Sequence, residues 1–214
     1  MFVANRMTKN PITVEPDTKV DEAAALMKKN NFHRLPVVES GRLVGFFSDK
    51  EIMKVAPSPA TTLAKYEITS LLAKMCVRDI MLTKIISVKE DATIEEAALL
   101  MSTHKIGGMP VISSVGAVVG VITETDIFKT FVDVMGLADG KTRLTLEVQD
   151  KVGTVMAIAE VFTGLGLNID SLITCKKPDG TYEIVVRGDF QNVPEVTARL
   201  AEKGYKVVHS VRIG

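Results

Sequence analysis

Two pairs of polar side chains have the spacing needed to hold a ligand at the start of a helix. Thr123 and Asp126 are three residues apart, and Ser48 and Glu51 repeat the spacing. A hydroxyl and a carboxylate one helical turn apart point the same way, and the carboxylate can accept hydrogen bonds from both hydroxyls of a ribose. The N-terminus of the helix favours a phosphate nearby. The same spacing also forms an ordinary capping box, which stabilises a helix and binds nothing.

These motifs occupy the same place in two copies of one pattern. Met7 and Met81 are 74 residues apart, and Gly45 and Gly120 are 75 apart because the second copy has one extra residue. Each copy is expected to fold as strand, helix, strand, strand and helix. Two such copies usually form a pseudo-two-fold pair with a shared cleft.

The two copies differ where a ligand would be held. His33-Arg34 in the first copy corresponds to Gly107-Gly108 in the second. The Arg34 guanidinium can bind two phosphate oxygens at once, whereas the glycines add no charge but leave room. Glu51 is longer than Asp126 by one methylene, which alters its hold on a ribose. We therefore predict one principal site that combines Arg34 with Asp126. The alternative is a solvated Arg34 beside a partly exposed His33.

The elements that position these residues follow from local signals. The first copy is expected to contain a strand over Pro11–Val14, a helix capped by Asp17-Thr18 and ended by Asn30-Asn31, and a hairpin of Leu35–Val38 and Leu43–Phe47. Thr93 to Glu96 is the matching helix start in the second copy. Between the copies, the spacing of Ile68, Leu71, Leu72 and Met75 predicts a connecting helix.

A different pattern follows the break at Gly136 to Gly140. Alternating residues from Arg143 to Val148 predict a strand, and a helical stripe follows the tight loop of Asp150 to Gly153. A strand from Leu167, a turn at Pro178-Asp179-Gly180 and a second strand come next. A last helix and strand complete the order βαββαβ, which is the ferredoxin-like arrangement.

Residues 1 to about 135 resemble a tandem pair of CBS domains. The resemblance rests on features that recur in order in both copies: Asn5-Arg6-Met7 and Asp79-Ile80-Met81, Leu35-Pro36 and Met109-Pro110, and the Gly-apolar-apolar-Ser/Thr-x-x-acid endings. The family binds adenosine ligands, so the resemblance implies AMP, ADP, ATP or S-adenosylmethionine here. The candidate ribose and phosphate ligands are Thr123, Asp126, His33, Arg34, Ser48 and Glu51. The resemblance places adenine contacts at Ile12, Thr13, Ile86 and Ser87, which are otherwise core residues.

Residues from about 142 to 214 resemble an ACT domain through Asp150-Lys151-Val152-Gly153 and Gly166-Leu167-Asn168-Ile169, although the family usually has proline at the position of Val152. This resemblance implies an amino-acid site between two subunits at Asp150, Gly153 and Asn168. The alternative is that Asp150 turns the chain, Gly153 permits tight packing and the domain only pairs. With a CBS pair followed by an ACT domain, the chain resembles the AcuB-type acetoin-utilisation proteins in its domain order.

Composition excludes several function classes. Twenty-six Lys and Arg residues balance 26 Asp and Glu residues, so no net charge attracts nucleic acid. The two cysteines and three histidines lack metal-ligand spacing, and no apolar run reaches membrane-spanning length. A cytoplasmic protein without a bound metal, away from membranes and nucleic acid, is expected.

The sequence therefore predicts an α+β protein with CBS repeats at 1–74 and 75–136 and an ACT domain at 142–214. The expected function is non-catalytic regulation by an adenine nucleotide, in a homodimer that acts on a partner enzyme. One alternative is a ligand-free structural dimerisation module. The other is a small hydrolase of acetoin catabolism, which would need a nucleophile–base or metal set that the sequence does not display.

Overall fold

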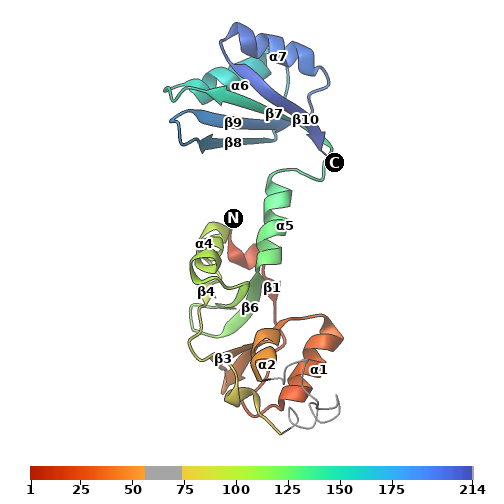
Figure 1. Ribbon diagram of the computed structural model, residues 1–214, viewed down its shortest axis with the longest axis vertical. Helices are drawn as coiled ribbons and strands as arrows, with labels where there is room; N and C mark the ends of the chain where they lie inside the picture. Colours follow the sequence, from red (N-terminus) through yellow and green to blue (C-terminus); the bar gives the residue numbers. More distant parts are fainter. Residues whose placement is uncertain (56–73, 214) are drawn as a thin grey trace. The chain divides into compact units, whose positions relative to one another are not determined.

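The computed structural model of the chain describes residues 1–55 and 74–213. These residues form two compact units, Met1–Ile127 and Phe128–Gly214, and each is described by itself below. Figure 1 shows the elements of both units.

The first unit contains the two sequence copies. The first copy supplies a helix, a hairpin and a second helix: α1 (Val20–Asn30), β2 (Arg34–Glu39), β3 (Arg42–Ser48) and α2 (Asp49–Val55). The second copy repeats this order after a short strand: β4 (Val88–Lys89), α4 (Ile94–His104), β5 (Gly108–Ile112), β6 (Val118–Thr123) and α5 (Glu124–Val134), a helix that continues into the second unit. Both predicted hairpins are confirmed, because β2 pairs with β3 and β5 pairs with β6, each antiparallel.

The opening segments of the two copies are exchanged in space. η1 (Val3–Asn5) and β1 (Thr8–Lys9) join the second copy, where β1 pairs with β6 and Val3 lies in that copy's apolar core. Conversely, η2 (Val77–Asp79) joins the first copy, and Val77 is buried in its core. Each half is therefore completed by the other half's first residues, which the linear repeat pattern did not reveal.

Two methionines fix this exchange. Met81 packs where a Cβ atom of Gly45 would lie, and Met7 packs in the same way against Gly120. A side chain at either position would overlap the methionine sulfur atom and force the methionine to move. The residues that mark the sequence repeat thus also hold the two halves together.

The starts of the first helices differ between the copies. At α4 the predicted capping box is confirmed: the Thr93 N–H donates to the Glu96 carboxylate at 2.7 Å, and the Glu96 N–H donates to the Thr93 hydroxyl at 3.2 Å. At α1 the predicted cap is wrong, because the N-cap residue is Lys19, which makes no capping bond through its side chain. The Thr18 hydroxyl instead accepts from the Glu15 N–H at 3.1 Å and closes the preceding turn.

The sequence also predicted a strand at the start of the first copy and a helix between the copies. The strand expected over Pro11–Val14 is reduced to one isolated bridge between Val14 and Val37. The predicted connecting helix falls largely on residues 56–73, which lie outside the described part. Its last predicted apolar residue, Met75, packs on the core of the first copy.

The second unit has the predicted βαββαβ order: β7 (Lys141–Val148), α6 (Thr154–Gly164), β8 (Ser171–Lys176), β9 (Tyr182–Gly188), α7 (Val193–Glu202) and β10 (Lys206–Ile213). The sheet order is β10-β7-β9-β8 and all pairs are antiparallel. Both helices pack on the face that carries Leu144, Leu146 and Val186, which forms the core. The strand predicted from Leu167 begins later, at Ser171.

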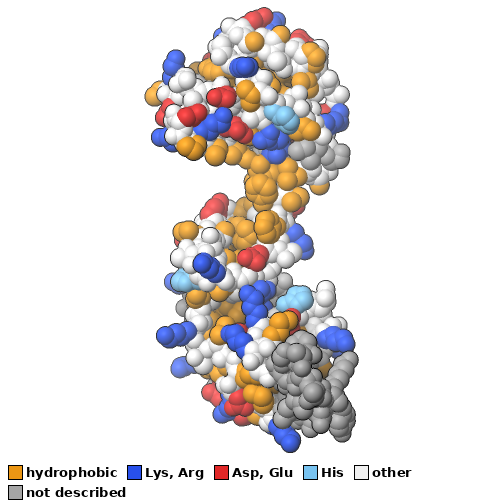
Figure 2. Space-filling model, viewed as in Figure 1, with side chains coloured by type: hydrophobic (Ala, Val, Ile, Leu, Met, Phe, Trp, Pro, Cys, Tyr) orange, Lys and Arg blue, Asp and Glu red, His pale blue; other side chains and the backbone are white. Residues whose placement is uncertain are grey.

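Acidic and basic side chains are interspersed over the face shown in Figure 2, as the charge balance of the sequence leads one to expect. Across 1–55 and 74–213, no helix has the length and apolar character required to span a bilayer.

Candidate functional site

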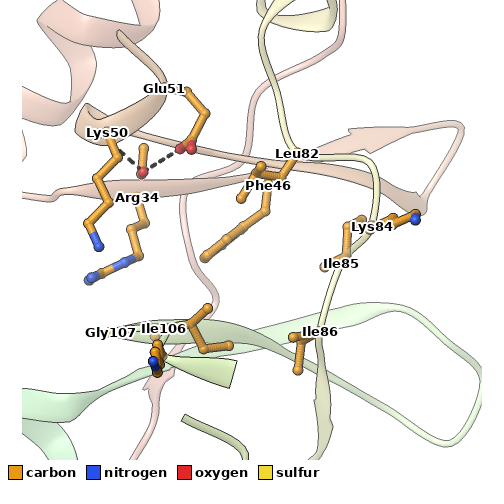
Figure 3. A pocket seen from close by; sticks show the side chains of 13 residues that line it. Arg34, Phe46, Lys50, Glu51, Leu82, Lys84, Ile85, Ile86, Ile106 and Gly107 are labelled. Atoms are coloured by element: carbon orange, nitrogen blue, oxygen red, sulfur yellow. Dashed lines mark hydrogen bonds between the residues drawn. The ribbon is translucent and has the colours of Figure 1, made fainter. Parts of the chain in front are cut away.

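A cavity in the first unit is lined by residues of both copies (Figure 3). Its polar residues are four cations, one carboxylate and one hydroxyl: Arg34, Lys50, Lys84, Lys105, Glu51 and Ser48. Its apolar residues are Phe46, Leu82, Ile85, Ile86 and Ile106, and Gly107 and Gly108 complete the wall. The cavity therefore combines an apolar wall with an excess of positive charge.

Arg34 enters this cavity because Gly107 leaves space for it. A Cβ atom at Gly107 would lie 2.5 Å from Nη2 of Arg34 and 2.9 Å from Oε2 of Glu124. Any larger residue would displace the guanidinium. In Figure 3 the charged ends of Arg34 and Lys50 lie close together above Gly107, whereas the Lys84 amine lies on the opposite side. The sequence led us to expect that the glycines leave room, and at Gly107 this room is occupied by the Arg34 guanidinium.

Glu51 is the buried acid of the cavity. Glu51 is 3% exposed and lies in the first turn of α2. The Ser48 hydroxyl donates to Oε2 of Glu51, and Oε1 lies 3.2 Å from the Lys54 amine. The Lys50 N–H donates to the Ser48 hydroxyl at 3.3 Å. Because each carboxylate oxygen can accept more than one hydrogen bond, Glu51 can still accept from a ligand hydroxyl.

Thr123 and Asp126 have the geometry of a capping box. The Thr123 N–H and hydroxyl both donate to Oδ2 of Asp126 at 2.8 Å, and the Asp126 N–H donates back to the Thr123 hydroxyl at 3.4 Å. Neither residue lines the cavity of Arg34. The sequence paired Arg34 with Asp126, whereas in this cavity Arg34 lies with Ser48 and Glu51. The cause is that Arg34 and Ser48 are direct partners in the β2–β3 hairpin.

The remaining predicted residues lie partly outside the cavity. His33 is exposed, and its Nδ1 lies 2.8 Å from the Asp49 carboxylate at the start of α2. Ile86 lines the cavity, while Ile12, Thr13 and Ser87 do not. The hydrogen bond to Asp49 directs the His33 ring toward α2. Of the two neighbouring basic residues, only Arg34 therefore lines the cavity.

Three cavity lysines were missed from the sequence. Lys50 lies inside the Ser48–Glu51 motif, Lys84 precedes Ile86 by two residues, and Lys105 precedes Gly107 by two residues. Each lies within two residues of a position that was singled out, so a search for charges around the repeated positions could have found them.

The candidate amino-acid site in the second unit is divided. Asp150 and Gly153 line one hollow together with Lys151 and Thr154. Gly153 has a φ of +90° and is the N-cap of α6, a conformation that favours glycine. Asn168 does not line this hollow. Its backbone carbonyl instead packs against Gly188, where an added Cβ atom would lie 2.6 Å from the carbonyl oxygen.

Within the described ranges, no group of three or more His, Cys, Asp or Glu side chains could hold a metal ion.

A profile of the CBS domain family matches residues 3–58 and 77–133, which together are more than half of the chain. A CBS domain-containing protein of Dictyostelium discoideum is 29% identical over 136 residues, covering 63% of this chain and 94% of that protein. The L-aspartate semialdehyde sulfurtransferase of Methanocaldococcus jannaschii is 32% identical over 131 residues, but the match covers only 23% of that enzyme. The similarity to this enzyme is thus confined to a part of it.

Three solved structures resemble part of the chain. The CBS domain pair of protein MJ0100, in complex with 5′-methylthioadenosine and S-adenosylmethionine, is 30% identical with a TM-score of 0.51, covering 61% of this chain and 99% of that one. CBSX2 in complex with AMP is 26% identical with a TM-score of 0.52, covering 63% and 98%. A Vibrio cholerae protein assigned to acetoin utilization (AcuB) is 26% identical with a TM-score of 0.53, covering 65% and 96%.

Proposed function

The chain belongs to the CBS domain family, and from this premise we propose that it is a non-catalytic regulatory protein that binds an adenine nucleotide in the cavity of Arg34 and Glu51. The observation that carries the proposal is the composition of this cavity. Four cations and one buried carboxylate surround an apolar wall, as a ligand with phosphates, a ribose and a flat base requires.

Each part of a nucleotide has a candidate partner. Glu51 accepts hydrogen bonds from the ribose hydroxyls, because its buried carboxylate is fixed by Ser48 and Lys54. Arg34 and Lys50 bind the phosphates, since their charged ends lie together on one side of the cavity. The apolar side chains of Ile85 and Ile86 contact the adenine.

The charge of the cavity selects among adenosine ligands. Arg34, Lys50, Lys84 and Lys105 outnumber Glu51, so a ligand with several negative charges is favoured. We therefore expect ATP or ADP to bind more tightly than AMP, and AMP more tightly than 5′-methylthioadenosine, which carries no phosphate. CBSX2 was solved with AMP and the CBS pair of MJ0100 with 5′-methylthioadenosine and S-adenosylmethionine, which supports an adenosine ligand here.

Calorimetric titration of the full chain with ATP, AMP, S-adenosylmethionine and 5′-methylthioadenosine tests the proposal. The expected result is saturable binding, tighter for ATP than for AMP and tighter for AMP than for 5′-methylthioadenosine, with the affinity for ATP falling as salt increases. Arg34→Ala should weaken ATP binding about tenfold or more, because it removes a charge-assisted contact. The matched control Arg42→Ala removes an exposed arginine from the same hairpin and should leave binding unchanged. No binding of any adenosine ligand would refute the proposal.

Thr123 and Asp126 are the ribose-binding candidates of the second copy, with Ile12 and Thr13 as its adenine candidates and His33 as a phosphate candidate. Their capping box uses Oδ2 of Asp126 for both bonds from Thr123. Titration stoichiometry tests this part of the proposal. Two nucleotides per chain, falling to one in Asp126→Asn, would assign these residues to a second site.

We extend the proposal to the second unit as an ACT domain over 142–214, following CBS repeats at 1–74 and 75–136. The βαββαβ order and the glycine N-cap of α6 support it. Asp150, Gly153 and Asn168 are its amino-acid candidates. Thermal stabilisation by any of the twenty amino acids at millimolar concentration would support ligand binding, and no shift would leave pairing as its role.

Pairing of two chains is supported by exposed apolar side chains on α5. Phe128 is 69% exposed and Phe131 is 54% exposed, and Figure 2 shows apolar side chains gathered there. Exposed apolar groups of this size commonly mark protein interfaces. Light scattering of the purified chain should give the mass of a dimer. A role beside an enzyme of acetoin metabolism is the proposed context, supported by the similarity to the Vibrio cholerae protein.

A further inference from the structure

Arg187 of β9 is a buried cation on the sheet face opposite the helices of the second unit. Its neighbour Val186 lies in the core beneath α6 and α7, and successive side chains of a strand point to opposite faces. Arg187 is directly opposite Ser171 on β8 and Arg143 on β7. Directly paired residues project from the same face, so these three side chains form one row across the sheet.

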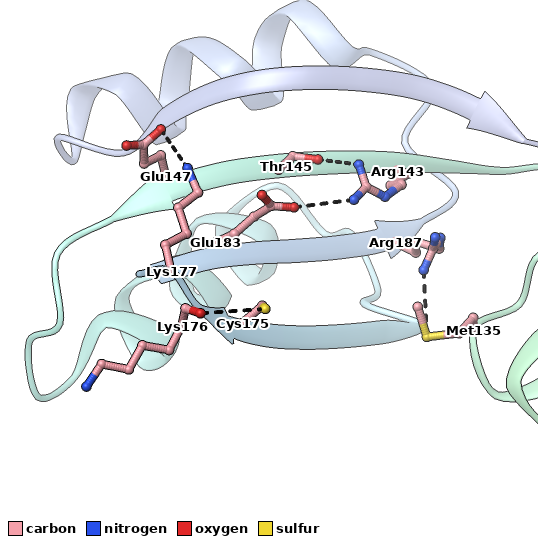
Figure 4. A network of polar contacts seen from close by, with 9 residues as sticks. All are labelled: Met135, Arg143, Thr145, Glu147, Cys175, Lys176, Lys177, Glu183 and Arg187. Atoms are coloured by element: carbon pink, nitrogen blue, oxygen red, sulfur yellow. Dashed lines mark hydrogen bonds and ion pairs between the residues drawn. The ribbon is translucent and has the colours of Figure 1, made fainter. Parts of the chain in front are cut away.

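The guanidinium of Arg187 has no strong acceptor. Arg187 is 6% exposed, yet among the described residues its hydrogen-bond partner is the thioether sulfur of Met135, at 3.9 Å from Nη1 (Figure 4). Its Nε is buried with no hydrogen-bond partner, and so is the hydroxyl of Ser171. A thioether is a weak acceptor, and a buried charged donor without an acceptor is costly to fold.

The second arginine of the row does not supply the missing charge. Nη1 of Arg143 donates to the Thr145 hydroxyl, and its Nη2 lies 3.6 Å from the Glu183 carboxylate, so Glu183 already balances Arg143 (Figure 4). Burial lowers the pKa of Arg187 first, and the like charge of Arg143 lowers it further. The row Ser171, Arg187 and Arg143 thus retains one uncompensated positive charge.

We propose that this row is a binding site for the carboxylate group of a small monoanionic ligand. The ligand takes the place of the Met135 side chain and receives two hydrogen bonds from the Arg187 fork and one from the Ser171 hydroxyl. One uncompensated positive charge matches one negative charge, which favours a monocarboxylate over a phosphate dianion. The site lies on the sheet face and is separate from the loop of Asp150 and Gly153.

Thermal denaturation of the full chain in sodium acetate or sodium pyruvate, against sodium chloride and sodium phosphate at equal ionic strength, tests this site. At about 50 mM, acetate or pyruvate should raise the unfolding midpoint by about 2–4 °C over chloride, because a ligand that binds only the folded state stabilises it. No difference between the carboxylates and chloride would overturn the proposal. A larger shift with phosphate than with either carboxylate would overturn the assignment to a monocarboxylate.

The variant Arg187→Met distinguishes a ligand-binding role of Arg187 from a purely structural one. This variant should abolish the carboxylate shift, and without ligand it should raise the midpoint by about 2–5 °C because an unpaired buried charge is removed. The matched control Arg199→Met changes an exposed arginine of α7 and should keep the full shift. A lower midpoint with an unchanged carboxylate shift in Arg187→Met would show a structural role. An unfolding midpoint that rises with protein concentration and does not change with added carboxylate would indicate that a second copy of the chain fills the site, and it would overturn the proposal.

Discussion

The two copies of the first unit use the same hydroxyl–acid spacing in different ways. In the second copy, the short Asp126 side chain accepts from the Thr123 backbone and completes a capping box. In the first copy, Glu51 accepts from the Ser48 hydroxyl and is a buried wall residue of the cationic cavity. The acid therefore completes a capping box in the second copy and lines the cavity in the first. Repetition of a motif therefore does not guarantee repetition of its role.

The copies are more alike in packing than in chemistry. Gly45 and Gly120 each accommodate a methionine from the opening segment of the other copy. The cavity residues at corresponding positions are Arg34 and Gly108, which differ in charge. Packing between the halves is thus the same in both copies, whereas the lining of the cavity differs between them.

The largest expected difference between the copies is in nucleotide affinity. Glu51→Gln should weaken ATP binding to the Arg34 cavity about ten- to a hundredfold, because hydrogen bonds to a charged acceptor contribute about 1.5–3 kcal/mol. Asp126→Asn should leave the affinity of this cavity unchanged. Calorimetry measures both, with Glu95→Gln, an exposed acid of α4, as the control. Equal losses in the two variants would remove the distinction between the copies.

The next largest effect concerns the two methionine pockets. Gly45→Ala and Gly120→Ala should each destabilise the chain by about 1–3 kcal/mol through overpacking. Gly120→Ala should cost more, because its Cβ would also lie 3.0 Å from the Thr8 carbonyl, which belongs to the backbone and yields less than a methionine side chain.

Urea unfolding measures these two losses of stability. Gly164→Ala in α6 is the control, because nothing lies within 4 Å of its added Cβ. A larger loss for Gly45→Ala than for Gly120→Ala would contradict the backbone argument.

A smaller difference lies in the helix starts. Thr93→Ala should lower stability by about 1 kcal/mol, because it removes the side-chain cap of α4. Lys19→Thr should raise stability by a similar amount, because Glu22 already stands where a capping box of α1 needs its acid. Urea unfolding of both variants checks this. Loss of stability in Lys19→Thr would mean that the Lys19 contact with the Cys76 sulfur, at 3.4 Å, matters more than a cap.

The smallest effect is a change in titration. Hydrogen bonds from the Thr93 backbone and then from its hydroxyl hold the pKa of Glu96 below its usual 4.5. A lowered folded-state pKa contributes stability above pH 4.5, and this contribution disappears as the pH falls through the lowered value. Thr93→Ala should raise the pKa of Glu96 part of the way back, because the backbone bond can remain.

Carboxyl NMR titration measures this change. The lowered pKa of Asp179, which depends on Thr181 in the other unit, is the control and should not move. An unchanged Glu96 titration in Thr93→Ala would show that the hydroxyl contributes nothing.

Sequence reasoning succeeded where the determining interactions are local. The hairpins, the capping box at Thr93 and the βαββαβ order follow from turn residues, caps and periodicity within a few positions of each other. It failed for the cap of α1 and did not foresee the exchange of the opening segments. In the second case Val3 is buried against residues of the second copy, about a hundred positions away along the chain.

The sequence by itself determined that the chain has two related copies followed by a different pattern, and it identified Arg34, Glu51 and Asp126 as candidate ligands, although it paired Arg34 with Asp126. Only the tertiary structure decided that Arg34 and Glu51 share a cavity with Ile86 of the other copy. It also placed Arg187 beside Ser171 and Arg143 without a counter-charge. The physical reason is that caps and turns act over a few residues, whereas cavities and charge rows depend on which distant strands become neighbours.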